Sequence, residues 1–188
     1  MNNQTLGTIA MICAPALLIG GLLVRGGDNA AITGIASMVF MVGWICSNIG
    51  MHRMQATGIG WWGHAVLIIQ LVGLVLAFLF GFFEATGLLG SDSVIFDVTD
   101  AAWPLSMLWM VVVGVTVIRA KRLSGWQRFV PLLCPFWLPI AGIVGMIFGW
   151  VTGNIVGFGY AAVLWVLLGN IVRSNSQQPV PTPRPSVQ

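Results

Sequence analysis

"WGHAVLIIQLVGLVLAFLFGFFE", residues 62–84, is an apolar run that carries no formal charge until Glu84 closes it. At about 1.5 Å per residue, a helix of this length covers the roughly 30 Å hydrocarbon core of a bilayer. A helix also satisfies its backbone hydrogen bonds inside one segment, which hydrocarbon surroundings demand. The stretch therefore predicts a transmembrane helix.

Five further apolar runs extend this pattern along the chain. The six predicted spans cover residues 6–24, 30–50, 62–84, 101–119, 126–148 and 151–172. Of the 188 residues, 57% are hydrophobic and only 7% are charged, against about 25% charged residues in soluble domains. We expect an all-α fold, a polytopic transmembrane bundle of six helices over residues 1–172, which could form three consecutive helical hairpins. Membrane lipids then surround most of its surface.

Lysine and arginine gather on one side of this six-span arrangement. The eighth basic residue, Arg25, shares the other side with all five acidic residues. Cytoplasmic connections carry an excess of Lys and Arg, so the pattern predicts a multi-pass protein of a bacterial cytoplasmic (inner) membrane with both termini in the cytoplasm. The seven basic residues on the predicted cytoplasmic side are Arg53, Arg119, Lys121, Arg122, Arg128, Arg173 and Arg184.

The end of the chain has a different composition. Residues 173–188 are polar and rich in proline, and such a segment cannot bury enough apolar surface to fold. We expect a disordered cytoplasmic tail. The formal net charge of +3 is small and scattered, which argues against a nucleic-acid partner.

One face of the third span is small and polar. At 100° per residue, five positions of this span cluster on one side. Small residues allow helices to approach closely, and an amide at membrane depth should face the bundle interior. The stripe is either a packing seam with one interhelical hydrogen bond or one wall of a polar cavity. Its members are Gln70, Gly73, Ala77, Gly81 and Glu84.

Polar side chains also lie near the predicted cytoplasmic ends of the second and third spans. Asn48 and His52 share a face of the second span, and His64 opens the third at a similar depth. The two imidazoles flank a short connection, so they could meet as hydrogen-bonded tips or, as the weaker alternative, bind a metal or haem. The sequence signals no cofactor, because it lacks an HExxH motif or any dense cluster of ligands.

The fifth span contains "FVPLLCPFWLPIAG", residues 129–142, with Pro131, Pro135 and Pro139 four residues apart. Each proline frees the carbonyl four residues earlier, and an unpaired carbonyl in hydrocarbon costs several kcal/mol. The proline side must therefore face protein, water or a ligand, and the helix should bend near Pro135. The prolines shape a rigid kink or, alternatively, expose carbonyls to a polar pocket that Asn48, His64 and Asn170 would also line.

Four glycines follow at strict four-residue spacing through the last predicted turn. This overlapping GxxxG pattern is typical of close helix contact. The contact could lie within the bundle, or it could join this chain to a second copy or to another subunit of a membrane complex. The glycines are Gly145, Gly149, Gly153 and Gly157.

No catalytic constellation accompanies these features. The leading interpretation is a non-enzymatic bundle that binds or moves a small apolar or lipid-like molecule. The alternatives are an accessory or structural subunit of a membrane complex and, less favoured, a membrane-embedded enzyme that uses Glu84 or the pair His52 and His64. The candidate ligand-binding residues are Asn48, His64, Gln70, Pro131, Pro135 and Asn170.

Overall fold

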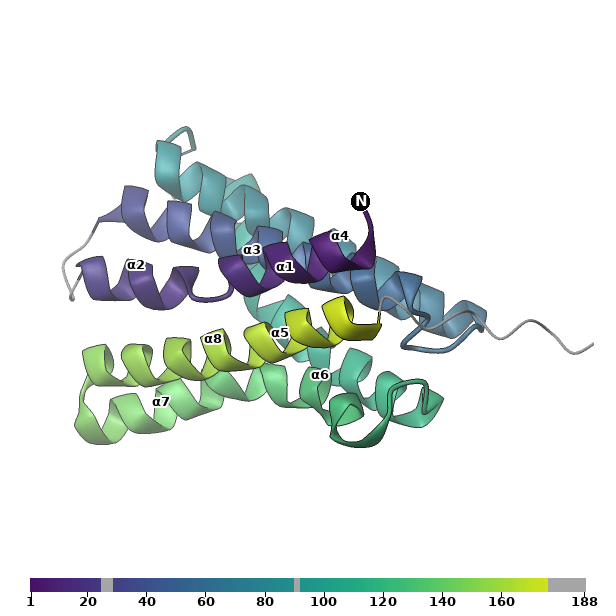
Figure 1. The fold of residues 1–188 in the computed structure, drawn as a ribbon. Coiled ribbons are helices and arrows are strands. Elements are labelled where there is room, and N and C mark those ends of the chain that lie inside the picture. Colours follow the sequence, from purple (N-terminus) through teal and green to yellow (C-terminus); the bar gives the residue numbers. More distant parts are fainter. Residues whose placement is uncertain (25–28, 90–91, 176–188) are drawn as a thin grey trace, which may run out of the picture.

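The computed structural model describes residues 1–24, 29–89 and 92–175, and Figure 1 shows their helical arrangement. No strand occurs within these three ranges. The first span consists of two helices, and the fifth span is broken into four short pieces. In chain order the elements are α1 (Asn3–Cys13), α2 (Ala16–Val24), α3 (Ala30–Arg53), α4 (Trp61–Thr86), α5 (Val94–Ala120), η1 (Gly125–Phe129), α6 (Val130–Leu133), η2 (Cys134–Phe136), α7 (Trp137–Phe148) and α8 (Trp150–Ser174).

Six helical segments of the described chain are long and apolar enough to cross a membrane. This confirms the all-α, six-helix bundle and indicates a multi-pass membrane protein. The largest difference from the predicted boundaries is at α5, which begins at Val94 rather than at residue 101. Its first turn contains Asp97. A charged residue is tolerated there because this end of the helix projects beyond the apolar run, and a negative charge stabilises a helix N-terminus.

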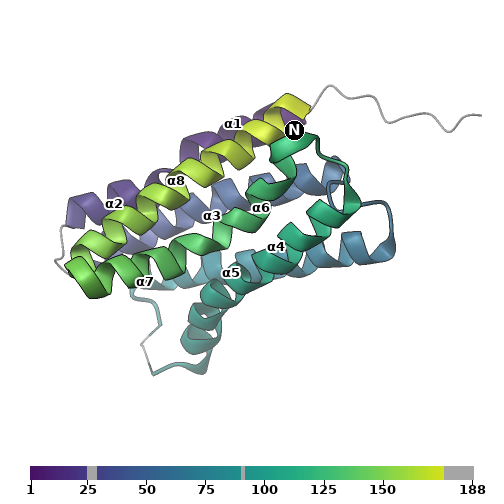
Figure 2. The same cartoon turned by 90° about the horizontal axis from the view of Figure 1, so that it is seen from below.

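Helix α3 lies at the centre of the packing. It contacts α1, α2, α4 and α8, while α4 packs on α5, and α7 packs on α8. The sequential hairpins α1/α2–α3, α4–α5 and α7–α8 are therefore all present. In addition, α8 runs along α1, so the first and last spans are neighbours, and Figure 2 shows α4 and α5 on the side of the bundle away from them.

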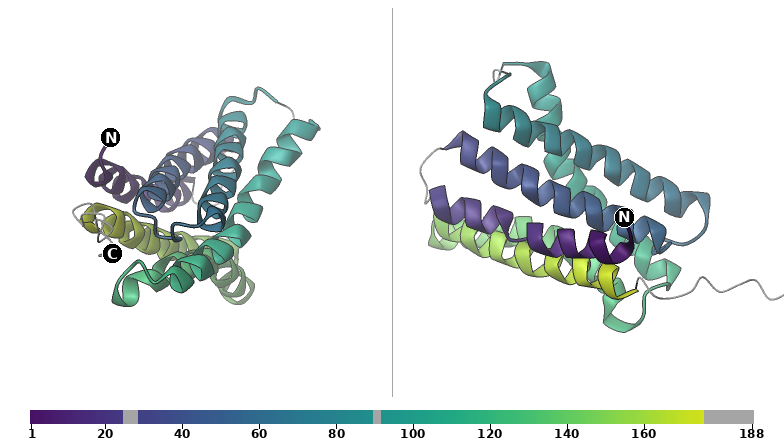
Figure 3. Two further views of the ribbon diagram at one scale, coloured as in Figure 1. Left: turned by 90° about the vertical axis from the view of Figure 1, so that its right-hand side faces the viewer. Right: turned by 45° about the horizontal axis from the view of Figure 1, so that its top comes forward.

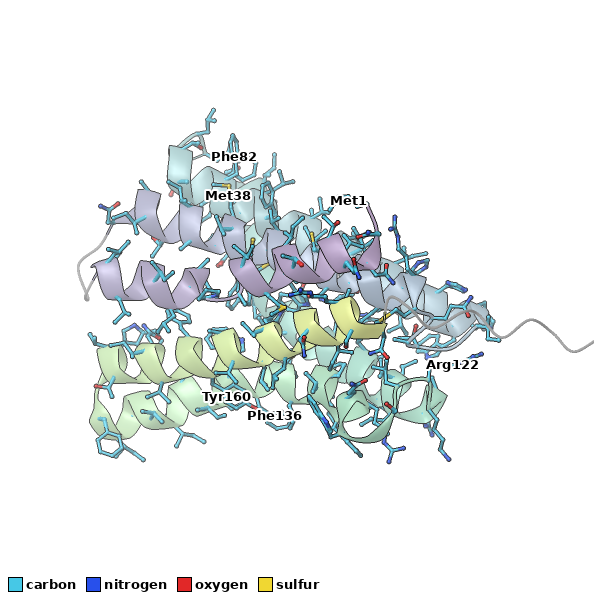
Figure 4. All side chains as sticks on the ribbon, in the orientation of Figure 1. Met1, Met38, Phe82, Arg122, Phe136 and Tyr160 are labelled. Carbon is cyan, nitrogen blue, oxygen red and sulfur yellow. The ribbon has the colours of Figure 1, made fainter. Side chains whose placement is uncertain are left out.

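The N-terminus and the end of α8 lie at the same end of the bundle (Figures 1 and 3). Met1 and Arg122 are both toward this end, and Phe82 is toward the other (Figure 4). Arg53 at the end of α3 donates a hydrogen bond to the Met1 carbonyl. The predicted disordered tail falls mainly on residues 176–188, which lie outside the described residues.

Aromatic side chains fill the space between α3 and α8. Trp44 and Trp165 meet edge to face, with ring centroids 4.9 Å apart, and Phe40 lies 5.1 Å from Trp165. All three are fully or almost fully buried. Because this part of the interior is occupied by large side chains, the larger grooves lie nearer the surface of the bundle.

The proline-rich span is interrupted, as predicted. Residues 134–136 form a 3₁₀ turn between two α-helical pieces, and Pro131 and Pro135 are buried whereas Pro139 is exposed. The carbonyl of Gln127 accepts a hydrogen bond from the Val130 amide, because 3₁₀ pairing shifts the bond by one residue. Two of the three prolines thus face protein, and part of the lost bonding is recovered within the backbone.

A side chain that the sequence analysis did not name bonds to this span, at a carbonyl that no proline frees. The hydroxyl of Tyr160 on α8 donates to the Leu133 carbonyl at 3.1 Å. The sequence suggested Asn48, His64 and Asn170 as partners of the proline-freed carbonyls. In the structure Asn48 bonds to the Leu67 carbonyl, His64 bonds to His52, and Asn170 is exposed on α8.

The glycine series closes the last hairpin. Gly149 forms the turn with a positive φ of 92°, a conformation that side chains disfavour. A Cβ atom added to Gly153 would lie 2.4 Å from the Ala141 carbonyl oxygen, so the backbones of α7 and α8 are in close contact at this residue. Gly153 and Gly157 therefore act within the bundle, inside the α7–α8 contact.

Candidate ligand groove between α4 and α5

Gln70 on α4 and Ser106 on α5 meet at the contact between the two helices. The Gln70 amide nitrogen Nε2 donates to the Ser106 carbonyl at 3.3 Å. The two side chains are only 1% and 3% exposed. Gln70 Oε1 and Ser106 Oγ nevertheless have no hydrogen-bond partner among the described residues.

These two side chains form the floor of a groove of about 530 Å³. Its rim is apolar and open to the outside of the bundle: Leu105 and Leu108 are 61% and 65% exposed. At the membrane-spanning part of a helix, that outside is lipid. The groove is lined by Ile69, Gln70, Val72, Gly73, Leu76, Val98, Ala102, Leu105, Ser106, Leu108, Trp109 and Val112.

Gly73 keeps the floor open. A Cβ atom at this position would lie 2.5 Å from Ser106 Oγ, a distance that would push the hydroxyl or the helix aside. Trp109 forms one wall, and its indole Nε1 donates to the Val66 carbonyl at 2.9 Å. That bond fixes the ring and ties α5 to α4, so the groove is bordered by an ordered side chain.

A second groove continues the same seam toward the end that carries the N-terminus. It also has a volume of about 530 Å³, and it shares Val112 with the first. Trp62 and Arg119 lie on its walls. The α4–α5 seam therefore carries two neighbouring grooves, one lined by Trp62 and the other by the buried Gln70 and Ser106.

His52 and His64 meet, as the short connection between them allowed. His64 Nδ1 and His52 Nε2 are 3.0 Å apart, and the rings pack edge to face with centroids 5.0 Å apart. One imidazole donates and the other accepts. No group of three or more metal-ligating side chains occurs in the part of the chain that the structure describes, whereas zinc takes four ligands in structural sites and three protein ligands in catalytic ones.

Asn48 lies at the contact of α3 with α4, apart from the groove lining. Its Nδ2 donates to the Leu67 carbonyl at 2.9 Å, and the side chain is buried. Pro131 and Pro135 are buried in the fifth span, and Asn170 is exposed. The six candidate ligand-binding residues are therefore distributed over several contacts, and of these six only Gln70 lines the groove, together with Gly73 from the predicted stripe.

The two proposed enzymatic sites lie at opposite ends of α4. His64 and Glu84 are twenty residues apart in one helix, which corresponds to about 30 Å. They cannot act on the same atom of a substrate. Any chemistry would have to use one of them without the other.

Ser106 was missed by the sequence analysis, although a signal was present. It is the only hydroxyl, amide or charged side chain between Asp100 and Thr116, and a lone polar residue in an apolar span is expected to face the bundle interior. Comparison with protein-family models, with curated proteins and with solved structures gives no match for this chain.

Proposed function

We propose that this protein is a non-enzymatic membrane bundle that binds a small apolar or lipid-like molecule in the groove between α4 and α5. The observation that carries the proposal is the pair of unpartnered polar atoms, Gln70 Oε1 and Ser106 Oγ, at the floor of an apolar groove. A buried polar atom without a partner costs about 1–3 kcal/mol. A ligand that supplies the missing hydrogen bonds offsets this cost.

A packing seam alone explains less of the geometry. It would account for the bond from Gln70 Nε2 to the Ser106 carbonyl. It would also account for a glycine, Gly73, opposite the Ser106 hydroxyl. It would not account for the open volume of the groove that these residues line. Ligand sites are typically apolar pockets of about 300–1,000 Å³ with a few placed polar groups, and the groove fits that description.

The open side of the groove favours entry from the lipid phase. Its rim residues are exposed on the membrane-facing surface, so an apolar molecule can enter laterally without crossing water. The same geometry favours binding over transport, because the groove runs along one surface of the bundle and aromatic side chains fill the space between α3 and α8.

Native purification with mass spectrometry tests this function. The wild-type protein, purified in a mild detergent, should retain a small molecule that Gly73→Leu loses, since the added side chain fills the groove floor. Gly142→Leu is the matched control, because a Cβ atom at Gly142 meets nothing within 4 Å. Retention of the same molecules by all three proteins, each folded by size-exclusion chromatography, would contradict the proposal.

We also propose that both termini are cytoplasmic, on the strength of the asymmetric basic residues. An impermeant thiol reagent applied to intact cells should label Leu88→Cys and leave Ser124→Cys unlabelled; both positions are exposed. A protein without Cys13, Cys46 and Cys134 serves as background. The reverse labelling pattern would overturn the orientation and leave the groove proposal standing.

A further inference from the structure

We infer that the ligand of the α4–α5 groove is a membrane-dissolved alcohol, whose hydroxyl group lies between Gln70 Oε1 and Ser106 Oγ. This inference rests on the proposed function and adds the chemical class of the ligand. At the groove floor, one atom lacks a hydrogen-bond donor and the other lacks an acceptor. Gln70 Oε1 is an acceptor without a donor, and Ser106 Oγ carries a proton without an acceptor.

The orientation of the Gln70 amide decides which atom is free. An amide can be turned by 180° so that oxygen and nitrogen exchange places, and the hydrogen-bond network must settle the choice. Here the amide end nearest α5 faces the Ser106 carbonyl at 3.3 Å. A carbonyl can only accept, so that end must be the NH₂ group. The free atom beside the groove is therefore the acceptor Oε1.

The hydroxyl of Ser106 fits against α4 because residue 73 is a glycine. Any side chain at residue 73 would begin 2.5 Å from Ser106 Oγ and would displace that atom. With glycine, Ser106 keeps its place in the lining of the groove, and its hydroxyl is buried there. A serine hydroxyl has one proton to donate, and here it has no acceptor among the described residues.

Only some ligand groups can donate to Gln70 Oε1 and accept from Ser106 Oγ. A hydroxyl donates one hydrogen bond, to Gln70 Oε1, and accepts another, from Ser106 Oγ. A ketone, ester or ether accepts from Ser106 and leaves Gln70 Oε1 unpaired. A hydrocarbon leaves both unpaired, and each unpaired group keeps its desolvation cost.

Depth in the membrane excludes the charged alternatives. Gln70 lies nine residues after Trp61 in α4, a rise of about 13 Å from the aromatic end of the helix. An ionised amine or carboxylate at such a depth is costly. Arg119, which lines the neighbouring groove, is too far away to pair with a carboxylate there, because it lies thirteen residues from Ser106 along α5, or about 20 Å. A neutral hydroxyl on an isoprenoid or fatty chain fits both the floor and the apolar rim.

Two matched pairs of probes test the inference: farnesol with farnesyl methyl ether, and 1-hexadecanol with its methyl ether. Each is titrated into the full-length protein in detergent, and affinity is obtained from the shift in thermal unfolding. Each alcohol should bind about tenfold more tightly than its ether, the factor that one hydrogen bond of about 1.4 kcal/mol supplies. Binding of neither alcohol, or equal binding of alcohols and ethers, would overturn the inference.

Two variants separate hydrogen bonding from the extra bulk of the methyl group. Gln70→Met should abolish the preference for the alcohol, because it removes the acceptor that only the alcohol uses. Ser106→Ala should weaken alcohol and ether alike and keep the preference. Ser47→Ala is the matched control, since Ser47 is buried and its hydroxyl already donates to the Gly43 carbonyl at 3.2 Å. A preference that survives Gln70→Met is steric and would refute the assignment of a hydroxyl.

Failure of the inference and failure of the proposed function give different results. If alcohols and ethers bind equally and Gly73→Leu removes both, the groove is a ligand site and only the chemical class is wrong. If Gly73→Leu leaves the binding of every probe and the retained molecules unchanged, the groove itself is not the site.

Discussion

Replacing Gln70 by Met should raise the stability of the ligand-free protein. Met has a similar length and a flexible, apolar side chain, so it can occupy the same space. The change removes the hydrogen bond from Nε2 to the Ser106 carbonyl, which is long at 3.3 Å. Interhelical hydrogen bonds of this kind average about 0.6 kcal/mol in a membrane protein.

The change also removes the buried acceptor Oε1, which has no partner among the described residues. That atom costs about 1–3 kcal/mol in the folded state. Subtracting the lost bond leaves a net stabilisation of about 0.4 to 2.4 kcal/mol. For a chain of this size, each kcal/mol raises Tm by about 2–4 °C, so a rise of a few degrees is expected.

The assay is thermal unfolding in detergent, followed by tryptophan fluorescence, with and without the molecule that co-purifies with the wild type. Delipidated Gln70→Met should melt above the delipidated wild type, and the order should reverse or narrow once ligand is restored. Gln4→Met, at an exposed position of α1, controls for the substitution itself and should change stability by no more than about 0.5 kcal/mol. A lower Tm for Gln70→Met in the delipidated state would show that Gln70 Oε1 is hydrogen-bonded within the fold. That result would contradict the proposal that a ligand binds at this atom.

Three further outcomes follow from the contacts of other spans. Gly7→Leu should destabilise the fold by at least about 1–3 kcal/mol, because its Cβ atom would lie 2.5 Å from the Gly169 carbonyl oxygen. Gly159→Leu is the control and should not destabilise the fold, because a Cβ atom there meets nothing within 4 Å. Equal melting temperatures for the two variants would contradict the α1–α8 contact. Tyr160→Phe should cost about 0.6 to 1.7 kcal/mol in chemical or thermal unfolding, since it removes the bond to the Leu133 carbonyl, and an unchanged Tm would mean that the fifth span supports its own backbone. Zinc should give the same thermal shift in the wild type and in His64→Phe, because two imidazoles provide too few ligands; a shift seen only in the wild type would restore the metal-binding alternative.

The sequence predicted the helices and one face of α4 well, for a clear physical reason. Long apolar runs have few structural options in lipid, and a lone Gln must turn inward; Gln70 is indeed buried. The boundary of α5 was harder, because a helix that projects past the membrane is not marked by hydropathy. Depth suggested Asn48, His64 and Asn170 as partners of the proline-freed carbonyls, but Asn48 and His64 bond elsewhere. Tyr160 on α8 bonds to the Leu133 carbonyl, which no proline frees.

The groove itself required the structure, since its two polar atoms come from different helices. In water, the contrast between a polar and an apolar face sets the rotation of a helix, but both faces of α5 are apolar and lipid supplies no such contrast. Close steric fit sets the rotation and the register instead: Gly114 lies against the backbone of Leu132, and Gly73 lies opposite Ser106. The second of these fits brings the hydroxyl of α5 to the amide of α4. A lone hydroxyl in one apolar span and a Gln–x–x–Gly pair in its neighbour are therefore two parts of one feature, and the fit of glycine against serine joins them.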